Sequence, residues 1–358
     1  MTKRENLLNA LRRQNPKYVP YSLVLCDAQQ EIFQAKTGST DYLEYFGACH
    51  RVIRLDATKH PHDYSQFHPN LPQGAWINDW GVGHAPGSVA HFSRMIHPMA
   101  HFTTPDEVWA FPTPDITADY RYVGVAESVK KYHSTGIATK FYAIQLFEPA
   151  WYWYGLDNFL CGMMQDDEMV HAMMEKMTAL KEEQAKKVAA TGVDIIVFGD
   201  DVGTQRGMMM SLELWDKWVK PYTKRIIRAA KAVNPDVLAY YHTDGAVEEI
   251  IPGLIDIGVD ILNPVQPECM CPAKIKARYG DKLSFWGTVG TQTTMPFGTT
   301  ADVRREVRAR IDTVGCGGGF VIAPTHVIEP EVPWENIVAF VEEARGYGAY
   351  ATSQTSYP

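Results

Sequence analysis

The residues best suited to chemistry form a His-x-Asp pattern, His242-Thr243-Asp244, at the end of an apolar run. In an extended chain residues i and i+2 point the same way, so both side chains can hold one ion. His326 ends a later apolar run and offers a third ligand. A fourth donor could be Glu268, Gln266 or Cys269. Such a set suits Zn²⁺ or another first-row metal with one open position.

The same pattern has an interpretation without a metal. Asp244 could fix the tautomer of His242 through a hydrogen bond, or both side chains could bind a substrate directly. The spacing alone does not separate the two interpretations.

A pair of adjacent carboxylates, Asp200-Asp201, ends another apolar run. Adjacent carboxylates repel, so one of them can have a raised pKa that suits proton transfer. Alternatively, one carboxylate positions the loop while Arg206 neutralises the other. The candidate catalytic residues are Asp200, Asp201, His242 and Asp244.

Further polar and aromatic residues follow the apolar runs or stand in the Asn-Asp-Trp-Gly segment near residue 80. Flat rings at a site suit an aromatic or cationic substrate, although core packing is the simpler role for each ring. The candidate substrate-binding residues are Gln145, Glu148, Gln205, Arg206, Gln266, Trp286, Asp79 and Trp80.

The elements that must position these residues begin near residue 137, where short apolar runs alternate with helical periodicity. The runs span Ala138–Gln145, Asp194–Asp201, Val237–Asp244, Asp260–Gln266, Leu283–Val289 and Gly319–His326. Strands that are apolar on both faces are typical of a parallel sheet covered by helices. In a βα barrel the carboxyl ends of such strands meet at one mouth, which would bring the candidate residues together.

Helical segments are expected at Asp167–Ala190, Leu212–Val233, Ala246–Ile257, Pro272–Tyr279, Ala301–Thr313 and Trp334–Tyr347, with Ser211 and Thr300 as N-caps. Two earlier candidate strands, Val19–Leu25 and Ala75–Val82, raise the strand count to eight. We therefore predict an α/β protein, a single (β/α)₈ TIM barrel over residues 1–358. Residues 1–136 would form an N-terminal cap and the first strands, and residues 137–350 the regular βα units.

Composition excludes other classes of protein. The formal net charge of −8 disfavours nucleic acid as a partner. The sequence lacks the apolar stretch that a membrane helix needs. The first residues are charged and do not read as a signal peptide, so we expect a cytoplasmic location.

The motifs Asp201-Val-Gly-Thr-Gln-Arg-Gly, Tyr241-His-Thr-Asp-Gly, Asp260-Ile-Leu-Asn-Pro-Val-Gln, Phe285-Trp-Gly and Ala323-Pro-Thr-His occur in this order. In them the sequence resembles the uroporphyrinogen decarboxylase superfamily, strongly over residues 137–347 and more loosely in the N-terminal part. The resemblance implies a (β/α)₈ barrel. It also implies either a tetrapyrrole decarboxylase or a zinc-dependent methyltransferase that works with corrinoid proteins, coenzyme M or other thiols.

Two departures from the family patterns favour the methyltransferase branch, acting on oxygen. The decarboxylases carry an Arg-rich segment after the first strand, whereas this chain has Leu25-Cys-Asp-Ala-Gln-Gln-Glu-Ile-Phe, which offers no cation for a polycarboxylate. The methyltransferases hold zinc with His-x-Cys and a later Cys. Here Asp244 replaces the first Cys and His326 stands near the second. A His/Asp set makes a stronger Lewis acid, which suits an ether oxygen better than a thiol.

The resemblance therefore implies a metal-dependent methyltransferase that takes a methyl group from a small methoxylated compound and passes it to a corrinoid protein. Zn²⁺ would be the metal and the corrinoid would arrive on the partner protein. A homodimer is also expected, because dimers occur in the superfamily. One alternative is a metal-free decarboxylase or lyase that uses Asp200, Asp201 and His242. Another is a barrel retained as a binding subunit.

Overall fold

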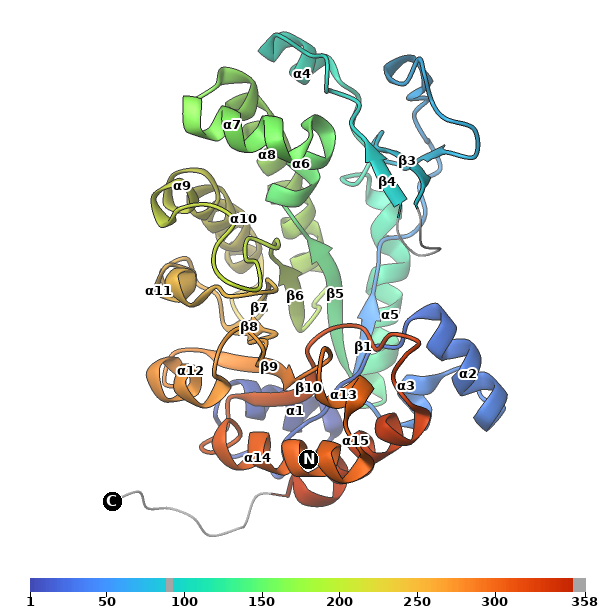
Figure 1. The fold of residues 1–358 in the computed structure, drawn as a ribbon, viewed down its shortest axis with the longest axis vertical. Helices are drawn as coiled ribbons and strands as arrows, with labels where there is room; N and C mark the ends of the chain where they lie inside the picture. Colours follow the sequence, from blue (N-terminus) through green and yellow to red (C-terminus); the bar gives the residue numbers. More distant parts are fainter. Residues whose placement is uncertain (88–92, 350–358) are drawn as a thin grey trace.

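The computed structural model describes residues 1–87 and 93–349. Its main sheet has seven strands, and every neighbouring pair is parallel. In spatial order they are β1 (His50–Ile53), β5 (Ala138–Ile144), β6 (Ile195–Phe198), β7 (Leu238–His242), β8 (Ile261–Asn263), β9 (Ser284–Val289) and β10 (Phe320–Pro324). The sheet curves and is flanked by helices (Figure 1). The six strands predicted between residues 138 and 326 are confirmed.

An extended segment beside β10 supplies the eighth position of the barrel. Tyr21 pairs with Ile322 and Leu25 with Ile328, both in parallel. On its other side, the Sγ atom of Cys49, next to β1, lies 3.7 Å from the carbonyl oxygen of Tyr21. The predicted first strand, Val19–Leu25, is thus an extended segment with isolated bridges to the β10 side, and the fold is the α/β barrel that the sequence predicts.

The second predicted strand, Ala75–Val82, is not a barrel strand. Its residues belong to the cap, where β2 (Trp76–Ile77), β3 (Gly83–Pro86) and β4 (Ser93–Ile96) form a small antiparallel sheet. The barrel uses β1 instead. Its sequence, His50-Arg-Val-Ile, escaped prediction because polar residues occupy its first two positions and break the apolar run.

Helices follow most of the barrel strands. They are α5 (Val123–Ser134), α8 (Glu168–Ala190), α9 (Leu212–Trp218), α10 (Lys220–Val233), α11 (Ile251–Asp256), α12 (Pro272–Tyr279), α14 (Thr300–Thr313) and α15 (Trp334–Tyr347). Ser211 caps α9 as predicted, whereas α14 is capped by Thr299, one residue before the predicted Thr300. Within the described ranges, no helix combines the length and apolarity that crossing a membrane requires.

The remaining helical elements lie outside the regular alternation of strand and helix. They are α1 (Lys3–Leu11), α2 (Asp27–Thr37), α3 (Tyr42–Tyr45), α4 (Pro105–Ala110), α6 (Phe147–Tyr154), α7 (Leu156–Gln165), α13 (Thr294–Phe297) and the 3₁₀ turns Ser65–Phe67, Asp119–Tyr122 and Glu248–Ile250. The small sheet and α4, α6 and α7 lie beyond the carboxyl end of β5 (Figure 1). The cap therefore stands over the mouth where the candidate residues were expected.

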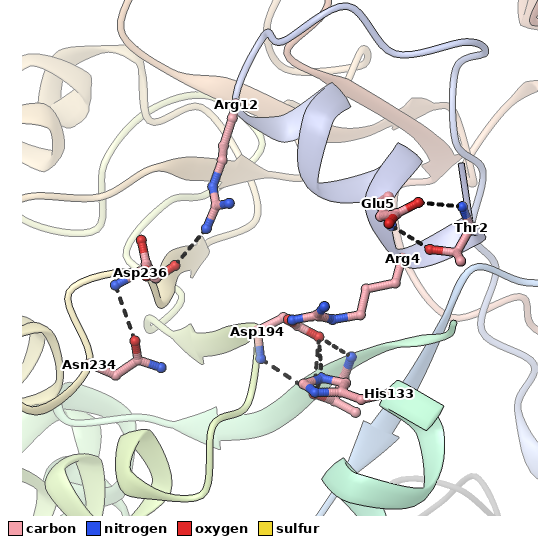
Figure 2. Close-up of polar contacts among 9 residues, drawn as sticks. Thr2, Arg4, Glu5, Arg12, His133, Asp194, Asn234 and Asp236 are labelled. Atoms are coloured by element: carbon pink, nitrogen blue, oxygen red, sulfur yellow. Dashed lines mark hydrogen bonds and ion pairs between the residues drawn. The ribbon is translucent and has the colours of Figure 1, made fainter. Parts of the chain in front are cut away.

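Helix α1 seals the opposite end. Its Leu7, Leu8 and Leu11 pack against apolar side chains of the barrel interior. Two N–H groups of Arg4 donate to Oδ1 of Asp194, at 3.0 and 2.7 Å, as Figure 2 shows. Oδ2 of the same carboxylate contacts Nε2 of His133 at 2.8 Å, so one buried acid joins α1, α5 and the start of β6. Helix α1 therefore covers the end of the barrel opposite the cap.

Candidate active site

A neighbouring amide distinguishes the two ring nitrogens of His242, which is the last residue of β7. Its Nδ1 atom lies 2.5 Å from Oδ1 of Asn263, and Nδ2 of Asn263 donates to the carbonyl oxygen of Trp286 at 2.6 Å. Because that carbonyl takes the amide NH₂ group, Oδ1 must accept, and Nδ1 of His242 must carry the proton. The Nε2 atom of His242 is therefore the ring nitrogen that remains available to a ligand.

Three ligand-type side chains gather at this nitrogen. Asp201, His242 and Asp244 each present one atom, and these atoms all lie within 4.8 Å of one another. Oδ1 of Asp201 lies 3.8 Å from Nε2 of His242 and accepts a hydrogen bond from the backbone N–H of Asp244 at 2.8 Å. This hydrogen bond fixes the loop after β6 against the loop after β7.

The electrostatic balance at Asp244 depends on its neighbours. Burial raises its pKa, the His242 ring lowers it, the charge of Asp201 raises it again and His326 lowers it. The net shift is upward. Asp244 is therefore a carboxylate that gains from a nearby positive charge.

Glu148 is a second acid, in the first turn of α6. Its Oε2 atom accepts from Nε2 of Gln145 at 2.7 Å, and its Oε1 atom accepts from the hydroxyl of Tyr152 at 2.9 Å. Burial, followed by the charges of Asp200 and Asp201, raises the pKa of Glu148 to about 7. This side chain can hold a proton near neutral pH.

Asp200 holds the helix that carries Glu148. Its carboxylate accepts the backbone N–H groups of Leu146 at 3.0 Å and Glu148 at 2.8 Å, at the start of α6. Burial raises its pKa to about 6 although these hydrogen bonds oppose the shift. The structure thus gives Asp200 the positioning role that the sequence left open. Arg206 is exposed and makes no ion pair with either aspartate in the described ranges.

His326 lies beside this cluster and not within it. It is exposed and lines a cavity of about 310 Å³ together with Asp244, Gln205 and Gln266. A cavity of this size lies at the lower end of the range for small-molecule sites. A second hollow, between α13 and α14, is lined by none of these residues.

Glu268, the other proposed metal ligand, is engaged elsewhere. Its Oε1 atom accepts from the hydroxyl of Thr293 at 3.1 Å and the N–H of Gln292 at 3.3 Å, which orders the loop after β9. In the part of the chain that is described, the ligand cluster contains Asp201 where the sequence suggested His326 and Glu268. Cys269 directs its Sγ atom to Oε1 of Gln205 at 3.3 Å.

The remaining predicted substrate residues divide by location. Trp286 is 2% exposed and lies in the barrel interior, so its burial does not support contact with a substrate. Asp79 and Trp80 lie in the cap turn between β2 and β3, and the carbonyl of Trp80 accepts from Nε1 of Trp153 at 2.9 Å. Asn263, which fixes the His242 ring, was not among the predicted site residues. Its signal was an amide inside an apolar strand, which requires a hydrogen-bond partner.

The profile of the uroporphyrinogen decarboxylase (URO-D) family matches residues 147–347, more than half of the chain. The protein therefore belongs to the uroporphyrinogen decarboxylase family.

Among solved structures, a methyltransferase from Methanosarcina mazei is similar to this chain with a TM-score of 0.67 and 18% identity, covering 97% of this chain and 99% of that one. Native xylanase 10B from Thermotoga maritima aligns over 97% of this chain and 99% of its own, with a TM-score of 0.46 and 10% identity. The first likeness shows a shared fold. A search of curated proteins finds no match.

Proposed function

We propose that this protein is a metal-dependent methyltransferase that removes a methyl group from a small methoxylated compound and passes it to a corrinoid protein. The carrying observation is the position of His242 Nε2, which faces Oδ1 of Asp201 at 3.8 Å with Asp244 beside it. A distance of 3.8 Å is too long for a direct hydrogen bond and is close to the separation of two ligands on one metal ion.

The residues present fit a zinc ion. Ligands of tetrahedral Zn²⁺ lie about 2.0–2.2 Å from the metal and hence roughly 3.4 Å apart. A metal-bound histidine typically donates its other N–H to a fixed acceptor, as His242 does to Asn263. Asp201, His242 and Asp244 would supply the three protein ligands of a catalytic site. We keep His326, which shares the cavity with Asp244, as a further donor.

A bound metal would supply a Lewis acid for the ether oxygen of the substrate. The chain contributes orientation and a proton. Gln205 and Gln266 line the cavity and present amide groups to a polar ligand. Glu148, whose pKa of about 7 leaves it partly protonated at neutral pH, can donate a proton from its carboxyl to the oxygen that loses the methyl group. The corrinoid of the partner protein is the proposed methyl acceptor.

Family membership and a fold shared with a methyltransferase support this proposal. The acidic segment after the first barrel strand, residues 25–33, supports it against tetrapyrrole decarboxylation. The proposal requires an open mouth, because the partner must bring its cofactor to the substrate. We propose a small-molecule methyl donor, and a homodimer as the assembly.

The direct test is a methyl-transfer assay. Purified protein is incubated with a panel of methoxylated compounds and a reduced corrinoid protein, and methylation of the corrinoid is followed by its absorbance. We expect activity that is lost on chelation, restored by zinc and absent in His242→Ala. His101→Ala, a change at an exposed histidine, is the matched control. Activity that survives both chelation and His242→Ala would disprove metal dependence.

A second candidate, a metal-free decarboxylase or lyase, is favoured by the raised pKa values of the acids. Those of Glu148 and Asp200 are about 7 and about 6, and that of Asp244 is also raised. Such groups suit acid–base chemistry near neutral pH. This candidate predicts turnover without metal and a pH dependence of turnover that changes in Glu148→Gln and Asp200→Asn.

A further inference from the structure

We infer that Arg54 and Tyr142 form an anion-binding subsite in the barrel mouth, and that it takes a carboxylate carried by the methylated substrate. The inference rests on the proposed function and names its substrate class, a methoxylated carboxylic acid. Tyr142 stands on β5, which adjoins β6, and Arg54 directly follows β1, one strand farther from the ligand cluster.

The alternation of strand β1 directs Arg54 toward the barrel axis. The ring of His50 lies 5.1 Å from that of Trp286 in the barrel interior, so His50 faces inward. Arg51 points the other way and pairs with Glu44 at 2.7 Å. Side chains alternate along an extended chain, so residue 54, four positions after His50, faces inward again.

The same argument places Tyr142 beside it. Lys140 on β5 faces inward, because its Nζ atom lies 4.9 Å from the ring of Tyr240 and 4.7 Å from that of Trp286. Tyr142 is two residues farther along, where the register of β5 shifts, and it lies close enough to the interior Tyr240 to raise the pKa of that hydroxyl, which places it on the same face. The register pairs Ile53 with Phe141, which brings the next residues together. The guanidinium carbon of Arg54 lies 4.3 Å from the centre of the Tyr142 ring.

Both groups remain available to a ligand. Tyr142 is 49% exposed although it faces the barrel axis, so the mouth is open beside it. Arg54 is exposed and forms no ion pair within residues 1–87 and 93–349. A guanidinium held flat on a ring keeps its N–H edge free for the two oxygens of a carboxylate.

Positive and negative side chains lie on different sides of the barrel mouth. Lys140 lies one layer below Arg54 and Tyr142 and adds positive charge on the β1 and β5 side. Asp201 and Asp244 make the β6 and β7 side negative. A substrate with an anionic end and a neutral ether end would therefore bind in one orientation, with its carboxylate at Arg54 and its ether oxygen near His242.

The span between the halves fits a small molecule. From β1 to β7 there are three strand spacings, about 14 Å along the curved sheet. The long side chain of Arg54 covers part of that distance. A single arginine also matches one carboxylate, which agrees with the absence of arginine in residues 25–33, where a polycarboxylate would need several.

The test compares two probes of matched shape, 3-methoxybenzoate and 3-methoxybenzyl alcohol, by titration calorimetry on the purified full-length protein. We expect the wild type to bind the acid about tenfold or more tightly than the alcohol, since a charge-assisted pair is stronger than a neutral one. Arg54→Gln should abolish this preference, and Arg54→Lys should restore part of it. Arg228→Gln, at an exposed arginine on α10, should retain it.

A further variant separates this subsite from the metal cluster. His242→Asn should keep the preference for the acid. Loss of the preference in His242→Asn, together with its survival in Arg54→Gln, would show that the carboxylate binds the metal and would overturn the inference. No measurable binding of the acid to the wild type, or equal affinities for the two probes, would overturn it as well. None of these outcomes depends on methyl transfer, so failure here is distinct from failure of the proposed function.

Discussion

Nδ1 of His242 lies 2.5 Å from Oδ1 of Asn263, and this contact decides which ring nitrogen faces the barrel mouth. Asn263 is itself fixed, because its NH₂ group donates to the Trp286 carbonyl. The orientation of the candidate metal ligand is therefore set by the neighbouring strand β8 and not by the loops. A site built on rigid strands holds its geometry better than one built on loops.

Replacing Asn263 with alanine should weaken metal binding without removing a ligand. Loss of a hydrogen-bond partner behind a metal-bound histidine typically lowers metal affinity about 10–100-fold. We expect this loss in Asn263→Ala, measured by competition with a chromophoric chelator. Asn158→Ala, at an exposed position on α7, is the control. Equal affinities in Asn263→Ala and the wild type would show that the contact does not orient a ligand.

The geometry of the cluster predicts that Asp201 and Asp244 contribute more to metal binding than His326 does. Asp201→Ala and Asp244→Ala should each strip most of the metal from the purified protein, because both side chains lie within the 4.8 Å cluster. His326→Ala should retain most of it, since this residue lies outside the cluster in the described ranges. Elemental analysis of the variants checks the order. If His326→Ala loses its metal while Asp201→Ala keeps it, the ligand set inferred from sequence is the better one.

Glu148 makes stability depend on pH. Its pKa is about 7 in the folded protein and 4.5 ordinarily, so between these values the folded chain binds more protons than the unfolded chain. Stability from this group therefore falls as pH rises from 4.5 to 7. In protein treated with a chelator, Glu148→Gln should raise the melting temperature at pH 8 by a few degrees and change it little at pH 4.5.

Glu31→Gln, at an exposed position on α2, is the control for this measurement. If Glu148→Gln is no more stable than the wild type at pH 8, the surroundings of Glu148 do not raise its pKa. Loss of activity in a variant that gains stability would be the trade-off expected of a functional acid.

Asp194 carries a large share of the stability at the closed end of the barrel. It accepts from Arg4 and contacts His133, and only 3% of its side chain is exposed. Removing one partner of a buried charged network costs about 3 kcal/mol. Asp194→Ala should lower the free energy of unfolding by that amount in urea titrations. Asp236→Ala should not, because Arg12 binds only the backbone carbonyl of Asp236 (Figure 2).

The sequence predicted the regular half of the fold because each strand there is buried on both faces and so reads as one apolar run. Strand β1 was missed for the opposite reason, since its inward residues include His50, whose ring packs on Trp286 inside the barrel. The candidate strand Ala75–Val82 was misplaced, because a short apolar pattern does not reveal whether it joins the barrel or the cap. Pairing depends on contacts between distant residues.

The site was predictable to a similar extent. Residues at strand ends converge by topology, so His242 and Asp244 could be grouped from sequence alone. The separate roles of Asp200 and Asp201 could not be predicted from sequence. Asp200 accepts hydrogen bonds from the start of α6, whereas Asp201 faces His242, and both contacts join distant parts of the chain. Trp286 was expected at the mouth and lies in the interior, since alternation along β9 decides which layer it occupies.

The most direct test of the central claim is the metal content of the purified, unchelated protein. The account predicts about one zinc or similar ion per chain, as in catalytic sites with three protein ligands, and near-complete loss of that ion in His242→Ala and Asp244→Ala. A wild-type protein without stoichiometric metal, and with the same metal content as Asp244→Ala, would contradict it.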